Sequence, residues 1–324
     1  MKCKFCEGYS VYRNKKDPVF VTPHSGPAFE VTTSRDDHSE TVASICWQKM
    51  KGTFVVANMS RKRVWGVDFN RDIPPKDLAI SMYPRFIEGE NSKELMEYRK
   101  KYGWVAADEK DYDTRANIFN SFWDEVNKGS MIIIIHRAFP RIKALPSIMD
   151  FTTFDNKGID KKFLSDILQE LNKKYFDFFK NIEKEFKNVI RLEQERVVSN
   201  IQRIYGKFDL ENIDVEFKAN LDKDIERIKE YAPNDVIENM KGKFTPEHFL
   251  KAVDSALEHC GIPELTIEKV FFGHLAGGPK RKLKPFEDKT IIQVEPSIFL
   301  NFWYPNKTAE IINEVIQKIK EQSK

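Results

Sequence analysis

The chain has 324 residues, 41% of them hydrophobic and 12% aromatic, which is enough to bury one large core or two modest ones. Its 53 Lys and Arg residues nearly balance its 50 Asp and Glu residues, so no overall field favours nucleic acid or an anionic membrane. No stretch approaches about 18 consecutive apolar residues and residues 1–7 lack a secretory pattern, so we expect a cytoplasmic protein that spans no membrane.

Up to about residue 155, short β-branched or aromatic runs alternate with helical patterns. We predict strands at 18–22, 53–58, 64–69 and 131–136, and helices near 37–51 and 115–127. The unbroken apolar run that begins at Met131 is typical of an inner strand in a mostly parallel sheet, covered on both faces.

Between about residues 158 and 260, long charged stretches carry apolar residues at helical spacing. Strand patterns return at 266–273 and 290–296, and residues 306–320 predict a closing amphipathic helix. The sequence therefore predicts an α/β domain, with a mostly parallel or mixed central sheet flanked by helices, made of residues 1–157 and 261–324. Residues 158–260 are predicted to form an inserted helical lobe, which is also a candidate surface for a homo-oligomer.

Polar side chains follow or close four of the predicted strands, and they are His24, Asn70 with Arg71, His136 and Glu295. In an open α/β sheet, ligands bind at the carboxyl ends of the strands, so we expect these side chains at one edge. A single histidine at a strand end is usually structural. Two of them in the same topological place, together with an Arg and a Glu, indicate a site.

The chemistry that these residue types support is specific. Two neutral imidazoles and a carboxylate form a three-ligand zinc site with an open position for water, whose pKa the metal lowers towards about 7. Another carboxylate beside that water can act as general base, and an Arg with an Asn can bind a substrate carboxylate. The pattern predicts metal-dependent hydrolysis of an amide, with His24 and His136 within reach of one ion.

Four segments carry a resemblance to a known family: "TPHSG" (22–26), "SRKRVWGVDFNRD" (60–72), "IIIIHRAFPR" (132–141) and "IIQVEPS" (291–297). In this order they resemble the N-formylglutamate amidohydrolase family, relatives of the zinc carboxypeptidases. The resemblance covers roughly residues 18–155 and 265–324 and implies a phosphorylase/hydrolase-like fold that binds Zn²⁺. It implies that His24 and His136 are metal ligands, that Asn70 and Arg71 hold the substrate carboxylate, and that Glu295 is the catalytic base.

The third metal ligand has more than one candidate. The family pattern places an Asp at a helix start with a second acid four residues later, which Asp36 and Glu40 satisfy. Asp36 is therefore preferred, followed by Asp37 and then Glu30. A carboxylate that does not bind the metal would suit an N-cap at this helix start.

The chain also departs from the family pattern. There the second His is followed by Ser and a small apolar residue, whereas Arg137, Ala138 and Phe139 follow His136. We count Arg137 among the substrate-binding candidates. Together with the helical insertion, this departure indicates a substrate larger than formylglutamate, namely an N-acyl amino acid or peptide-like molecule that bears a carboxylate.

Other interpretations stay open at this point. Cys3 and Cys6 form a single CxxC, which is either half of a metal site or a reduced surface pair. Arg61 and Arg63 either add charge near the site or only keep an edge soluble. The chain could also be a non-catalytic scaffold that keeps a hydrolase fold and engages a partner through its helical insertion.

Overall fold

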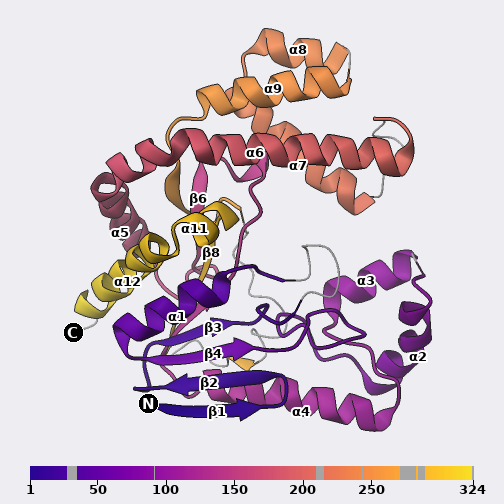
Figure 1. Ribbon diagram of the computed structural model, residues 1–324, viewed down its shortest axis with the longest axis vertical. Helices are drawn as coiled ribbons and strands as arrows, with labels where there is room; N and C mark the ends of the chain where they lie inside the picture. The colour runs from indigo at the N-terminus through magenta and orange to yellow at the C-terminus, as the bar shows by residue number, and fades with distance from the viewer. Residues whose placement is uncertain are drawn as a thin grey trace. The chain divides into compact units, whose positions relative to one another are not determined.

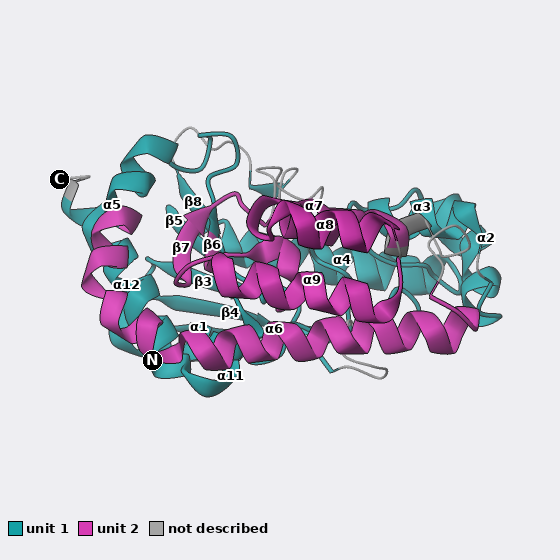
Figure 2. Ribbon diagram, turned by 90° about the horizontal axis from the view of Figure 1, so that it is seen from above, with its two compact units in different colours: residues 1–137, 151–167, 271–324 teal, residues 138–150, 168–270 magenta. Residues whose placement is uncertain are grey.

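The computed structural model describes residues 1–27, 35–90, 92–208, 215–242, 244–270, 282–283 and 289–322, with the backbone alone at 215–217 and 322. Its chain divides into two compact units, which Figure 2 distinguishes by colour. One unit contains residues 1–137, 151–167 and 271–324, and the other contains 138–150 and 168–270. Compared with the predicted boundaries, residues 138–150 and 261–270 lie with the helical unit, and 158–167 lie with the sheet unit.

The predicted α/β class is confirmed by an eight-stranded mixed sheet in the order β1-β2-β4-β3-β5-β8-β6-β7. The strands are β1 (Lys2–Cys6), β2 (Tyr9–Arg13), β3 (Val19–Thr22), β4 (Thr53–Ala57), β5 (Met131–Ile135), β6 (Ser147–Thr152), β7 (Glu264–Ile267) and β8 (Thr290–Pro296). The pairs β3–β4, β3–β5 and β5–β8 are parallel. The carboxyl ends of β3, β5 and β8 therefore meet at one edge, as the sequence predicted.

Helices cover both faces of the sheet unit. They are α1 (Ser39–Met50), α2 (Lys76–Ile87), α3 (Lys93–Lys101), α4 (Glu109–Val126), α11 (Ile298–Trp303) and α12 (Pro305–Gln322). Helix α1 packs on β3, β4 and α12, whereas α4 packs on β2 and β4 (Figure 1). Alternate residues of a strand point to opposite faces, so each inner strand packs against helices on both faces and is apolar throughout.

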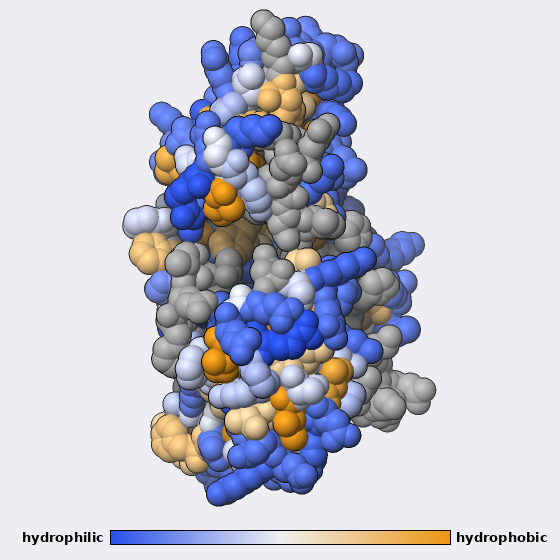
Figure 3. All heavy atoms as spheres, turned by 90° about the vertical axis from the view of Figure 1, so that its right-hand side faces the viewer, coloured by the Kyte–Doolittle hydropathy of each residue, from blue (hydrophilic) through white to orange (hydrophobic). Residues whose placement is uncertain are grey.

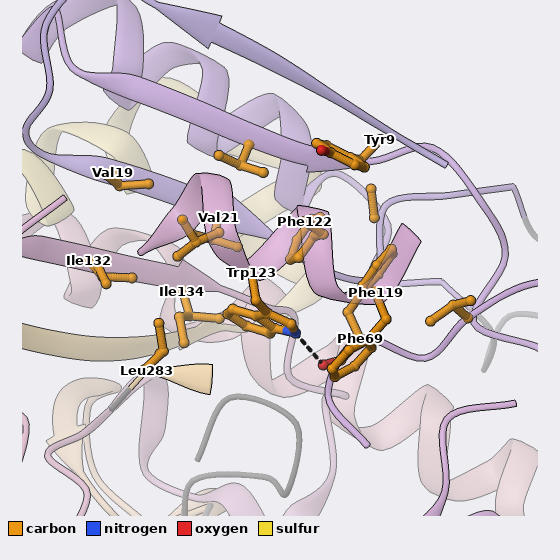
Figure 4. Packing of buried hydrophobic residues seen from close by; sticks show 14 of the residues in the cluster. Tyr9, Val19, Val21, Phe69, Phe119, Phe122, Trp123, Ile132, Ile134 and Leu283 are labelled. Atoms are coloured by element: carbon orange, nitrogen blue, oxygen red, sulfur yellow. Dashed lines mark hydrogen bonds between the residues drawn. The ribbon is translucent and has the colours of Figure 1, made fainter. Parts of the chain in front are cut away.

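The core beneath α4 joins this helix to the strands β2, β3, β4, β5 and β8 and to the loop that carries Val67 and Phe69. Val19 and Val21 of β3 and Ile132 and Ile134 of β5 lie in it beside α4 (Figure 4). The loop contributes Phe69, whose ring stacks on Phe122 with 4.1 Å between centroids. Trp123 Nε1 donates to the Phe69 carbonyl at 3.1 Å, which fixes the loop backbone to α4 (Figure 4).

The strand predicted at 64–69 is wrong, because these residues form a loop. Arg115 of α4 donates to the carbonyls of Arg63, Val64 and Gly66 at 2.8–3.2 Å. A side chain thus satisfies backbone acceptors that a neighbouring strand would otherwise satisfy. Gly66 also lies so close to the Ser60 carbonyl that a Cβ would meet its oxygen at 1.9 Å, which requires glycine there.

The helical unit contains most of the remaining helices, which are α6 (Phe176–Tyr205), α7 (Val215–Tyr231), α8 (Asn234–Gly242) and α9 (Pro246–His259). Helix α5 (Lys161–Lys174) begins in the sheet unit and ends in this one. The apolar stripe of α6, including Phe179, Ile182 and Phe186, is buried, and α6, α7 and α8 all pack on α9. The helical spacing read from the sequence is therefore core packing.

Hydrophilic residues predominate on the face shown in Figure 3, where the apolar side chains are scattered among them. Scattered apolar residues of this kind are ordinary for a globular protein surface. Within the described parts of the chain, the helices include none with the length and apolarity that a membrane span needs.

A buried carboxylate ties α4 to the first two strands. Glu125 is 6% exposed, and it accepts hydrogen bonds from Lys4 of β1 at 2.9 Å, Arg13 of β2 at 3.0 Å and Lys128 at 2.7 Å. Burial alone would raise the pKa of Glu125, but these hydrogen bonds, led by that of Lys128, lower it to about 2. The charged form of Glu125 therefore stabilises the fold.

Glu125→Gln should lower the free energy of unfolding by about 1–3 kcal/mol at neutral pH, the lower end reflecting solvent screening of the exposed lysines. An unfolded Glu titrates near pH 4.3, so the stabilisation is complete above this pH and fades as the pH falls towards the folded pKa of about 2. The free energy of unfolding, measured with urea, should differ less between Glu125→Gln and wild type near pH 3 than near pH 7. An equal difference at both pH values would contradict this account.

Candidate metal centre

His24 and Asp36 are joined by their backbones before their side chains meet. His24 lies two residues after the end of β3, and its carbonyl accepts a hydrogen bond from the Asp36 amide at 3.0 Å. The Asp36 carbonyl in turn accepts from the Ser39 amide at 3.1 Å, where α1 begins. This places the carboxylate of Asp36 between the end of β3 and the start of a helix.

His136 reaches the same edge from β5. Its amide donates to the Val294 carbonyl at 2.9 Å, so the β5–β8 ladder continues one residue past the end of β5. Its own carbonyl lies 3.5 Å from Nδ2 of Asn301, which is fully buried. The backbone on both sides of the imidazole is therefore fixed.

The two imidazoles share one carboxylate oxygen. Asp36 Oδ2 lies 3.1 Å from His24 Nδ1 and 2.7 Å from His136 Nδ1, and the ring centroids are 4.9 Å apart. All three side chains are buried, and one ligand atom from each lies within 4.8 Å of the other two. The predicted proximity of His24 and His136 is confirmed, and Asp36 is the acidic residue that joins them.

A second carboxylate, which the sequence analysis missed, determines the tautomer of His24. Asp68 Oδ1 lies 2.9 Å from His24 Nε2, and an ionised carboxylate only accepts hydrogen bonds. Nε2 of His24 therefore carries a hydrogen, and Nδ1 of the neutral ring presents its lone pair to Asp36. In the sequence, Asp68 is an acidic residue inside the apolar run 64–69. The prediction of a strand over this run gave Asp68 no role at the site.

The side-chain amide of Asn70 contacts Nε2 of His136, the ring nitrogen that faces away from Asp36. Asn70 Nδ2 lies 3.0 Å from His136 Nε2, while Asn70 Oδ1 is buried without a hydrogen-bond partner in the described part of the chain. A half-turn of this amide lets Nε2–H of His136 donate to Oδ1 and satisfies the orphaned oxygen. In that arrangement Nδ1 of His136 also presents its lone pair to Asp36.

The donor set then fits a divalent cation. Two Nδ1 lone pairs and a carboxylate oxygen converge, and such groups repel one another unless a positive charge lies between them. The outer nitrogens bound to Asp68 and Asn70 match the supporting contacts that orient metal-binding histidines elsewhere.

Three arginines surround the far oxygen of Asp68. Nε of Arg61 lies 3.4 Å from Asp68 Oδ2, Nη2 of Arg63 lies 3.5 Å away, and Nε of Arg71 lies 3.9 Å away. Burial alone would raise the pKa of Asp68, but Arg61, followed by His24 and Arg63, holds it well below its usual range. Arg61 and Arg63, whose role the sequence left open, thus add charge at the site.

Arg61 also reaches the candidate metal ligands. Its Nη1 lies 3.2 Å from His24 Nδ1 and 3.9 Å from Asp36 Oδ1. The guanidinium supplies positive charge beside the lone pair of His24. A cation bound to Nδ1 would take the place of this contact.

Glu295 is next to His136 through strand register. Ile135 pairs with Val294, so His136 and Glu295 are neighbours one step further along the two parallel strands. Glu295 Oε1 accepts from Gln293 Nε2 at 2.8 Å, and its charge acts on Arg61 and Arg137. Glu295 is only 5% exposed.

The other acidic candidates do not join the cluster. Asp37 Oδ2 lies 3.6 Å from Arg137 Nη1, and its Oδ1 lies 3.8 Å from Arg35 Nε. Glu30 lies outside the described residues. Arg137, the substrate-binding candidate, donates to the Arg35 carbonyl at 2.7 Å and has a side chain only 2% exposed, so it anchors the segment before α1.

Cys3 and Cys6 are also separate from this cluster. They lie three residues apart in β1 and therefore point to opposite faces of the strand. Cys6 packs against the core beneath α4, whereas Cys3 is exposed, and both thiols are free. This arrangement matches the reduced pair rather than two ligands of one metal.

Comparisons with protein-family models, curated proteins and solved structures find no match for this chain. The family resemblance and the roles carried over from it therefore remain predictions. The structure brings His24, Asp36 and His136 together, and it places Asp68 and Asn70 in contact with the two imidazoles.

The variants Asp36→Asn and Asp37→Asn should show which of these two neighbouring carboxylates binds the metal. Loss of a supporting contact alone weakens metal binding by about 10- to 100-fold, so Asp36→Asn, which removes a ligand charge, should weaken zinc binding at least about a hundredfold. Asp37→Asn removes the same charge from a long contact to Arg137, outside the cluster, and should change the affinity by less than about tenfold. Competition with a chromophoric chelator measures both, and equal losses would contradict the assignment of Asp36.

Proposed function

We propose that the protein is a zinc-dependent amidohydrolase that cleaves an amide in a carboxylate-bearing substrate, either an N-acyl amino acid or a peptide-like molecule. The observation that carries the proposal is the convergence of His24 Nδ1, His136 Nδ1 and Asp36 Oδ2 in a buried site at the carboxyl edge of the sheet. The ordered resemblance to the N-formylglutamate amidohydrolase family points to the same chemistry.

His24, His136 and Asp36 would hold the ion, since two imidazoles and a carboxylate leave an open position in a tetrahedral zinc site. When bound, zinc supplies Lewis acidity, which lowers the pKa of water towards about 7 and polarises a carbonyl. Asp68 and Asn70 would keep each ring in the tautomer that presents Nδ1. Loop residues thus support ligands that come from strand ends and a helix start.

Glu295 is the proposed general base. Its carboxylate accepts a proton from the attacking water as the new C–O bond forms, and it returns that proton to the leaving nitrogen as the C–N bond breaks. The contact from Gln293 Nε2 to Oε1 holds the carboxylate at the edge of β8. Its place next to His136 puts this step beside the proposed ligands.

Arg71 is the proposed contact for the substrate carboxylate. Its side chain is 36% exposed, against 21% for Arg61 and 14% for Arg63, so it is the most open of the three guanidiniums around Asp68. Its Nε has no hydrogen-bond partner in the described part of the chain, and the contact to Asp68 is long. A planar guanidinium with free donors suits two-pronged binding of a carboxylate.

The alternative is a scaffold that keeps the fold without catalysis. The observation in its favour is the contact from Arg61 to His24 Nδ1, since a permanent guanidinium there would balance the carboxylates without an ion. Metal analysis of the purified protein separates the two functions. Zinc at one equivalent agrees with the hydrolase, whereas a protein that neither carries nor binds divalent metal agrees with the scaffold.

Glu295→Gln keeps the size and shape of the side chain but removes the base. In a screen of N-acyl amino acids and short peptides, this variant should turn over the best substrate with kcat at least about a hundredfold below wild type. Zinc content should stay at the wild-type level because the three ligands are intact. Near-normal kcat in a zinc-loaded variant would exclude Glu295 as the base.

The contrasting variant in the same assay is Arg71→Ala. The substrate carboxylate does not react, so loss of its contact to Arg71 should mainly raise KM. Where this contact also positions the amide for reaction, kcat should fall as well. A substrate analogue with an amide in place of the carboxylate should lose its dependence on Arg71. If the analogue responds to Arg71→Ala as strongly as the acid does, Arg71 does not bind the carboxylate.

A further inference from the structure

A basic hollow of about 580 Å³ lies in the sheet unit, away from the candidate metal centre. It is lined by Met1, Lys2, Arg13, Asn14, Lys15, Lys16 and Lys128, so five of its seven residues carry a positive side chain and none carries a negative one. The whole chain has a formal charge of only +3. The lining of the hollow therefore concentrates far more charge than the average surface.

Most of these cations lack a carboxylate of their own. Arg13 and Lys128 share Glu125, which is also bound by Lys4 outside the hollow. Lys2, Lys15 and Lys16 form no ion pair among the residues that the structure describes. Elsewhere in the sheet unit, partly buried basic residues such as Lys76 and Arg85 each contact two acids.

Two further lysines add to the field around the hollow. Burial and then the charge of Lys16 lower the pKa of Lys289, and burial lowers that of Lys320, where Asp17 opposes the shift and Lys15 adds to it. The nearby acid, Asp17, uses both carboxylate oxygens to accept from the amides of Ser130 and Met131 and from the Ser130 hydroxyl. The repulsion between these lysines is a cost that a bound anion would relieve.

The hollow belongs to the edge of the sheet opposite the candidate metal centre. Arg13 is the last residue of β2 and pairs with Thr53, the first residue of β4, because these strands are antiparallel. The metal ligands lie instead beyond the carboxyl ends of β3 and β5. A strand of five residues spans about 16 Å, so one small ligand cannot occupy both places.

We propose that this hollow binds a small ligand that carries several phosphate groups. Clustered lysines offer many N–H donors and point charges, which match closely spaced phosphate oxygens better than a single carboxylate. Its volume falls in the range of small-molecule pockets, about 300–1,000 Å³. The lining contains no aromatic side chain on which successive bases could stack, which favours a compact polyphosphate over single-stranded nucleic acid.

The fold gives this site a rigid floor. Arg13 is held by Nε on the Thr53 hydroxyl at 3.3 Å and by Nη2 on Glu125 at 3.0 Å. The Thr53 hydroxyl in turn donates to the Lys15 carbonyl at 2.7 Å, and the Asn14 amide donates to the Gly52 carbonyl at 3.0 Å. The backbone that carries Lys15 and Lys16 is thus fixed to β4, while their side chains reach solvent.

The test is calorimetric titration of the full chain with inorganic tripolyphosphate. Wild type should bind one equivalent, and the double variant Lys15→Ala/Lys16→Ala should bind at least about tenfold more weakly, because it loses two charge-assisted contacts. The control Lys93→Ala/Lys110→Ala removes the same charge from exposed lysines elsewhere in the sheet unit and should bind like wild type. Asp36→Asn should also bind like wild type, which guards against a signal from chelated metal.

Further titrations with ATP, inositol hexakisphosphate and a single-stranded oligonucleotide identify the source of the phosphates. Binding of any of the small polyphosphates with the same dependence on Lys15 and Lys16 supports the proposal and ranks the ligands. No binding by wild type, equal losses in the two double variants, or loss of the signal in Asp36→Asn would overturn it. Tighter binding of the oligonucleotide than of every small polyphosphate would overturn it in favour of a nucleic-acid surface.

Discussion

The contact on which the site depends is the sharing of Asp36 Oδ2 by two imidazole nitrogens. His24 and His136 come from β3 and β5, which are neighbours in the sheet, so their strand ends bring the rings together. The backbone bond between Asp36 and His24 then brings the carboxylate to them. Asp68 closes the arrangement, because its bond to His24 Nε2 leaves Nδ1 as a lone pair directed at another acceptor. Two imidazole lone pairs and a carboxylate that meet in a buried site repel one another unless a positive charge lies between them.

Much of the fold could be predicted from hydrophobic pattern. The runs at β3, β4, β5 and β8 are short, apolar and followed by polar groups, and the structure places these strands within a residue or two of the prediction. The same runs placed His24, His136 and Glu295 at one edge, because parallel strands align their carboxyl ends. The preference for Asp36 over Asp37 depended instead on the family resemblance, since both acids lie before the same helix.

The rest required tertiary contacts that no local pattern contains. Residues 64–69 alternate like a strand, yet Arg115 takes up their carbonyls and Phe69 is held by Trp123 in the core. This anchoring leaves Asp68 and Asn70, on either side of Phe69, to face the two imidazoles. Strands β1 and β2 were missed because lysines, a serine and an arginine interrupt their short apolar patterns, as an edge hairpin allows. The basic hollow was missed for a similar reason, since β2 and the turn after it bring together lysines from three separate segments.

X-ray absorption spectroscopy of the zinc-loaded protein tests the central claim most directly. Coordination by His24, His136 and Asp36 predicts a shell of nitrogen and oxygen only, at about 2.0–2.1 Å, with the outer-ring scattering of two imidazoles. The outer-ring signal should fall to that of one imidazole in His136→Ala. A sulfur contribution at about 2.3 Å would instead assign the metal to cysteines such as Cys3 and Cys6. Either that result or a wild-type spectrum without imidazole scattering would contradict the account.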